Sequence, residues 1–130
     1  MTLVLDSGGV SMLAGHRARL HEIRRRGEWP PLVPSAVLVE ALTGDHRRDF
    51  HEIRLLRACI VHPVDEELAR DAAALRASAA APRTTSAVDA IVVAEADRAG
   101  GGVVLTSDPD DLGALAQHTR NVVRVSGSGD

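Results

Sequence analysis

The sequence predicts a single α/β domain with a mostly parallel central sheet flanked by helices. Short apolar, β-branched runs alternate along the whole chain with longer segments of helical periodicity. A length of 130 residues suits one domain with one core, and no internal repeat or long linker divides it. Apolar residues make up 45% of the chain and charged residues 25%, which excludes a disordered or fibrous class. We therefore expect one domain over residues 1–126 and a flexible tail over residues 127–130.

The expected strands are short apolar runs bounded by proline, glycine or polar residues. In chain order they cover residues 3–5, 31–34, 59–62, 103–106 and 122–125. The second strand is brief because it is bracketed by prolines, which cannot donate to a hydrogen-bond ladder.

The expected helices fill the segments between these strands. Leu13, Leu20 and Ile23 recur at near-helical spacing and predict one helix from Ser11 to Arg26, which Gly27 ends. Further helices are expected from residue 35, over residues 50–57, 65–79 and 86–99, and from residue 109. The acids at positions 65–67 belong in the first turn of their helix, where the helix dipole favours negative charge.

Several classes of protein are disfavoured by simple counts. No apolar stretch approaches the roughly 20 residues that span a bilayer, and the first residues lack the basic segment of a signal peptide. These features predict a cytoplasmic protein. Cys59 is the only cysteine, so an internal disulfide and a multi-cysteine zinc site are excluded. Its apolar neighbours suggest that it packs in the interior.

The net charge is −3, and all 15 basic residues are arginine, with no lysine. Clusters at residues 24–26 and 47–48 could contact phosphates bidentately, although solvated helix faces explain them as well. An acidic protein is still able to cleave RNA if cations neutralise its acidic site. Charge is therefore compatible with a nuclease without indicating one.

Two aspartates follow expected strands directly. Asp6 comes after residues 3–5, and Asp108 closely follows the strand at 103–106. In open α/β sheets the carboxyl ends of the strands form the ligand crevice. If these two strands are neighbours, both side chains point into one crevice.

Two further acids interrupt strongly apolar helices. Glu40 lies in Ala36–Leu42 and Asp89 in Ala87–Ala94, and both segments are apolar on nearly every side, which predicts buried helices. A buried carboxylate must become neutral, pair with a cation or coordinate a metal. An arginine partner for Glu40 remains an alternative.

Helix capping explains part of the same pattern. Ser86 and Asp89 are spaced as in a capping box, and Asp108-Pro109 has the pattern of an N-cap followed by proline. Four acids on separate elements are nevertheless an improbable product of capping alone. Oxygen ligands without cysteine or paired histidine suit Mg²⁺ or Mn²⁺.

Four segments, taken together and in their order along the chain, resemble the PIN-domain ribonucleases, and among these the VapC-like toxins of type II toxin–antitoxin systems. They are Val4-Leu5-Asp6-Ser7-Gly8-Gly9, Pro34-Ser35-Ala36-Val37-Leu38-Val39-Glu40, Val88-Asp89-Ala90-Ile91-Val92-Val93-Ala94 and Leu105-Thr106-Ser107-Asp108-Pro109-Asp110-Asp111-Leu112. The resemblance runs along the whole chain. Gly8-Gly9 departs from the small-then-apolar continuation that is more usual in the family.

The resemblance implies a Mg²⁺- or Mn²⁺-dependent endoribonuclease whose catalytic and metal-binding residues are Asp6, Glu40, Asp89 and Asp108. Asp6 and Asp89 match the family's metal ligands most directly. Ser7 and Asp111 are implied accessory residues, and Arg83, in the loop before Asp89, is a candidate RNA contact. The implied partners are an RNA substrate, a small cognate antitoxin and a second copy of the chain in a homodimer.

Two alternatives remain open at the level of sequence. The first is a PIN-fold protein with little or no catalysis that binds RNA or a protein through the same crevice. The second is a metal-dependent phosphatase with a strand-end nucleophile, but the expected Asp-x-Asp arrangement is missing at Asp6-Ser7-Gly8. The presence of all four acids favours the nuclease.

Overall fold

The computed structural model describes residues 1–127, and in this range five parallel strands form one sheet in the order β3-β2-β1-β4-β5. The strands are β1 (Thr2–Leu5), β2 (Leu32–Pro34), β3 (Ile60–His62), β4 (Gly102–Leu105) and β5 (Val123–Ser126). The α/β fold class expected from the alternating pattern is confirmed. Each expected strand is present to within two residues of its expected bounds.

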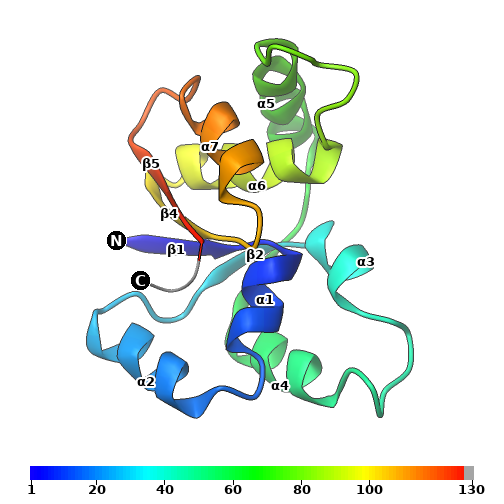
Figure 1. Ribbon diagram of the computed structural model, residues 1–130, viewed down its shortest axis with the longest axis vertical. Coiled ribbons are helices and arrows are strands. Elements are labelled where there is room, and N and C mark those ends of the chain that lie inside the picture. The colour runs from blue at the N-terminus through cyan, green and yellow to red at the C-terminus, as the bar shows by residue number, and fades with distance from the viewer. Residues whose placement is uncertain (128–130) are drawn as a thin grey trace.

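Helices cover both faces of this sheet (Figure 1). The first group, on one face, comprises α1 (Ser7–Leu13), α2 (Arg17–Arg25) and α4 (Phe50–Ala58). On the opposite face lie α5 (Glu66–Ala77), α6 (Ala87–Arg98) and α7 (Pro109–Ala116), while the short α3 (Val37–Ala41) follows β2. Burial of apolar strand and helix side chains between these layers forms the core.

The two central strands set the position of the candidate site. β1 and β4 are hydrogen-bonded neighbours in register, with Leu5 opposite Leu105. Val4 and Val104 are completely buried, as expected for parallel strands covered on both faces. The carboxyl ends of the two strands therefore lie side by side, as the sequence argument required.

The single helix expected over residues 11–26 is wrong, because the structure has two helices there. Asp6 caps α1, which begins at Ser7, and the chain leaves the helix at Ala14. Gly15 then adopts a φ of +76°, a left-handed conformation that favours glycine and redirects the chain into α2. Apolar spacing alone did not reveal this break.

The expectation of a buried helix around Glu40 is also wrong. α3 has only five residues, and of these only Val37 is buried. Val39 is 83% exposed and Glu40 is exposed. An apolar run of this length does not distinguish a buried helix from a short turn of helix at the surface.

Two further expectations concern membrane-spanning helices and the C-terminal tail. In residues 1–127, no helix is long and apolar enough to cross a membrane. Residues 128–130 of the expected tail lie outside the described residues.

Candidate metal centre

Asp6 occupies the end of β1 and the N-cap of α1, where its side chain is held from two sides. Its Oδ1 atom accepts a hydrogen bond of 2.8 Å from the backbone N–H of Gly9. Its Oδ2 atom accepts a hydrogen bond from the hydroxyl of Thr106. Asp6 is only 6% exposed, and this burial raises the pKa of its carboxyl against the opposing effect of the hydrogen bonds. The carboxylate is thus fixed in one orientation beside the sheet.

Thr106 connects Asp6 to the loop after β4. The side chain is completely buried, and its Oγ1 atom accepts a hydrogen bond of 2.9 Å from the backbone N–H of Asp108. One hydroxyl therefore positions both the first aspartate and the backbone of the last. Thr106 was not among the site residues predicted from the sequence, although a threonine at a strand end two residues before a candidate ligand was a usable signal.

Asp89 lies in the first turn of α6. Its backbone N–H donates to Ser86 Oγ at 3.2 Å, so the serine half of the expected capping box is present. The pKa of the Asp89 carboxyl is raised to about 6, first by burial and then by the negative charges of four other carboxylates. Those four are Asp6, Glu40, Asp108 and Asp111. Acids that lie up to 105 positions apart in the sequence are thus electrostatic neighbours in the fold.

Glu40, Asp108 and Asp111 form the exposed rim of this acidic group. Asp108 takes the N-cap position of α7 with Pro109 at the helix start, but within residues 1–127 its side chain makes no capping hydrogen bond. Asp111 lies one turn later, and its contact with the Asp108 carboxylate raises the pKa of Asp111. Capping therefore leaves the Asp108 carboxylate available for another role.

The donor set fits a hard divalent cation in its chemistry. All the donors are carboxylate oxygens, which Mg²⁺ and Mn²⁺ prefer. Each of the main influences on the pKa of Asp89 disfavours its ionised form, and in residues 1–127 no basic side chain is among them. Across the same residues, no three His, Cys, Asp or Glu side chains converge closely enough to enclose an ion. The carboxylates are close enough for their charges to interact, but they are too far apart to coordinate one ion together in this arrangement.

The two glycines after Asp6 allow α1 to approach the end of β4. A Cβ atom on Gly8 would overlap Ser107, and one on Gly9 would overlap the carbonyl oxygen of Leu105. This contact explains the Gly8-Gly9 pair, which departs from the PIN-domain pattern. Neither position has room for a side chain, so the glycines let the start of α1 lie directly against Leu105 and Ser107.

Ser7 and Arg83 lie near the acids in the sequence, and the roles implied for them stay predictions. Ser7 is half-buried as the first residue of α1, and Arg83 is exposed in the turn before α6. The end of that turn is held by Arg76, whose Nε donates to the carbonyl oxygen of Thr85 at 2.7 Å.

Glu95 is a buried acid outside this group, and it was not predicted from the sequence. Glu95, on α6, is 3% exposed, and its Oε1 atom lies 2.9 Å from Nδ1 of His62 at the end of β3. Burial raises the pKa of the Glu95 carboxyl, and the nearby His62 and Arg98 oppose that rise. Glu95 sits in the same apolar helix as Asp89, so the signal that selected Asp89 applied to it equally. Cys59, which we expected in the interior, is only partly buried, and this burial raises the pKa of its thiol to about 11.

Comparisons with known proteins add no family to this description. No protein-family model matches the chain, and no curated protein matches it.

Proposed function

We propose that this protein is a Mg²⁺- or Mn²⁺-dependent endoribonuclease of the PIN-domain type that hydrolyses RNA phosphodiesters at the acidic group. The supporting observation is the pKa of Asp89, which is raised to about 6 first by burial and then by the charges of four other carboxylates, at the end of β1, in α3 and at the start of α7. A folded protein keeps such mutually repelling carboxylates together at a cost in stability, and a bound cation removes that repulsion. The PIN-domain resemblance assigns the same residues.

Asp6 and Asp89 are the proposed direct ligands in this site. The hydrogen bonds from Gly9 and Thr106 orient Asp6 and leave further lone pairs on its carboxylate. Asp89 lies in the first turn of α6, where its carboxylate interacts electrostatically with that of Asp6. Glu40 is the proposed ligand or orienter of a bound water, and Asp108 is the proposed ligand of a second ion or of an outer water. When bound, the metal supplies a Lewis acid that activates water and offsets phosphate charge.

The protein's own residues contribute orientation and charge. Asp6 is immobilised before substrate arrives, so little reorganisation of this carboxylate is needed during the reaction. Asp89 must lose its proton to act as a ligand, which places its transition near pH 6 in the metal-free protein. Asp111, beside Asp108, adds negative charge to the rim.

A toxin role, with a small antitoxin partner and a homodimeric state, rests on the resemblance alone. Induced expression in bacteria should arrest growth, and co-expression of the small gene next to its own should restore it. Normal growth despite abundant, active protein would contradict the toxin role.

The nuclease activity is tested directly with purified protein. We expect it to cleave RNA with Mg²⁺ or Mn²⁺ and to lose activity in EDTA, whereas Asp6→Asn should abolish cleavage without unfolding the protein. RNA binding without cleavage under any of these metal conditions would instead identify a PIN-fold binding module. Undiminished cleavage in EDTA would refute the metal site.

A further inference from the structure

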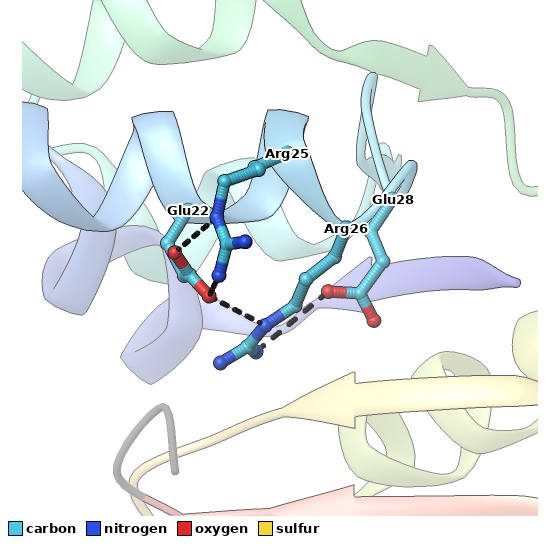
Figure 2. A network of polar contacts seen from close by, with 4 residues as sticks. All are labelled: Glu22, Arg25, Arg26 and Glu28. Atoms are coloured by element: carbon cyan, nitrogen blue, oxygen red, sulfur yellow. Dashed lines mark hydrogen bonds and ion pairs between the residues drawn. The ribbon is translucent and has the colours of Figure 1, made fainter.

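The arginines of α2 are divided between two sides of the helix. On one side, Arg25 and Arg26 both pair with Glu22, with N–O distances of 2.8 and 3.3 Å, and Arg26 also approaches Glu28 at 3.9 Å. Figure 2 shows this network facing the sheet. The positive charge of this side is therefore largely neutralised within the protein.

The other side of α2 faces α4 across a groove of about 300 Å³. Arg17 and Arg24 from α2 and Arg54 from α4 line it, and the same three side chains line an adjoining hollow of about 400 Å³. No carboxylate from residues 1–127 lines either space. Within the part of the chain that the structure describes, none of the three arginines forms an ion pair. The groove therefore carries uncompensated positive charge on a protein whose net charge is negative.

Aromatic rings lie beneath two of these guanidinium groups. The Arg24 guanidinium carbon is 4.4 Å from the ring centroid of Trp29, which also lines the groove. The corresponding distance from Arg54 to the Phe50 ring is 5.6 Å. A guanidinium stacked on a ring still offers its N–H edge to phosphate oxygens and its outer face to a base. The stacking also reduces the side-chain entropy lost when a ligand binds.

The groove is separate from the acidic group. Gly15, which follows α1, lies on its wall, whereas Asp6 precedes α1. The seven residues of α1 place roughly 10 Å of helix between these two ends. Figure 1 shows α2 and α4 beside the end of α1 that is remote from β1.

We propose that the groove between α2 and α4 binds the phosphate backbone of a single-stranded RNA segment that flanks the cleavage position. The proposal rests on the proposed nuclease function and adds a second contact for the same substrate. Phosphates match the planar arginine forks, and bases match the stacked guanidinium and indole surfaces, a combination typical of single-strand binding. An acidic peptide would satisfy the charges and leave the aromatic surfaces without a role.

The test measures RNA binding in the absence of catalysis. A fluorescent single-stranded RNA of about 12 nucleotides is titrated with protein in EDTA, and anisotropy gives the Kd. We expect Arg17→Ala, Arg24→Ala and Arg54→Ala each to weaken binding by about 3- to 10-fold. The dependence of log K on log salt should fall by about 0.7 for each arginine removed. Arg24→Lys should restore part of the affinity, because it keeps the charge but loses the planar fork.

Arg25→Ala on the neutralised side of the same helix is the matched control, and it should change the Kd less than twofold. Thermal melting of each variant in the same buffer establishes that it is folded. The proposal is overturned if the wild type does not bind RNA, if Arg25→Ala weakens binding as much as the groove variants, or if poly-glutamate competes as well as RNA. The last result would identify an acidic-peptide groove.

Cleavage assays separate this proposal from the nuclease proposal. With Mn²⁺, the groove variants should raise KM while kcat stays unchanged, because they remove binding remote from the reacting atoms. If groove variants lose RNA binding and the wild type never cleaves, the groove stands as an RNA site and the nuclease proposal fails. If the wild type cleaves and the groove variants bind and cleave normally, only the groove proposal fails.

Discussion

The hydroxyl of Thr106 donates a hydrogen bond to Oδ2 of Asp6, a residue one hundred positions earlier in the chain. The hydroxyl oxygen of Thr106 also accepts a hydrogen bond of 2.9 Å from the backbone N–H of Asp108. Because both partners are candidate ligands, this buried hydroxyl joins the two central strand ends into one site.

Removing the Thr106 hydroxyl should therefore affect stability and metal affinity together. Thr106→Val keeps the side-chain shape but leaves the Asp108 N–H without its acceptor and Oδ2 of Asp6 without its donor. We expect a loss of about 1–3 kcal/mol in the free energy of unfolding, measured with denaturant in EDTA. Mn²⁺ affinity should also fall, whereas Thr106→Ser should retain most of both properties. Equal behaviour of the valine and serine variants would show that the hydroxyl is unimportant.

The raised pKa of Asp89 predicts how stability depends on pH. Its folded-state pKa of about 6 lies above the ordinary aspartate pKa of 3.8, so between these values the folded state binds more protons than the unfolded state. Metal-free protein should lose stability as pH rises from about 4 through 6. The shift corresponds to about 3 kcal/mol, which solvent screening of this partly exposed side chain reduces to about 1–2 kcal/mol.

Asp89→Asn should remove this contribution. Denaturant unfolding in EDTA, compared between wild type and variant at pH 4 and pH 7.5, isolates it from the other acids. The variant should be the more stable protein at pH 7.5, with the advantage disappearing toward pH 4. A constant difference across this range would contradict the assigned pKa.

The close approach of α1 to β4 predicts opposite effects at two helical glycines. Gly9→Ala places a methyl group against the Leu105 carbonyl, which belongs to the backbone and cannot move aside, so we expect a loss of about 1–3 kcal/mol. Gly113→Ala in α7 is the control, because nothing lies within 4 Å of its added Cβ. That variant should gain about 0.5–1 kcal/mol from helix propensity. Comparable unfolding midpoints for the two variants would exclude the proposed contact.

The sequence predicted the parts of the site that depend on strand ends. A parallel sheet places the carboxyl ends of neighbouring strands together, so Asp6 and Asp108 could be assigned to one crevice from the positions of β1 and β4. Asp89 was also predicted, because an acid near the start of an apolar helix needs a partner or a ligand. These inferences needed only local patterns and the topology rules of parallel sheets.

Other features depend on packing between distant segments. The break at Gly15 reflects the change of direction between α1 and α2, and hydrophobic spacing continues across it. Glu40 is exposed because α3 ends after five residues, before its apolar side chains can all be covered. The Glu95–His62 contact joins α6 to β3, and no local pattern in either segment identifies the other as its partner.

The contact between Glu95 and His62 should contribute to stability. His62→Ala leaves the Glu95 carboxylate buried without its closest partner, so we expect a loss of about 1–3 kcal/mol. Adding Glu95→Leu should recover part of the loss, with a coupling energy of about 0.5–3 kcal/mol in a double-mutant cycle at pH 7. Strictly additive effects would show that the two side chains do not interact.

The central claim is that the acidic group binds a divalent cation, and metal-dependent thermal melting tests it most directly. A ligand that binds only the folded protein stabilises it by RT ln(1 + [L]/Kd), about 2.7 kcal/mol at a hundredfold excess over Kd. Wild-type protein should show this gain across a Mn²⁺ titration that starts in EDTA. Asp71→Asn, an exposed change on α5, should show the same gain, whereas Asp89→Asn and Asp108→Asn should gain much less. If both of those variants keep the full metal-induced shift, or if the wild type shows none, the acidic group is not a metal centre.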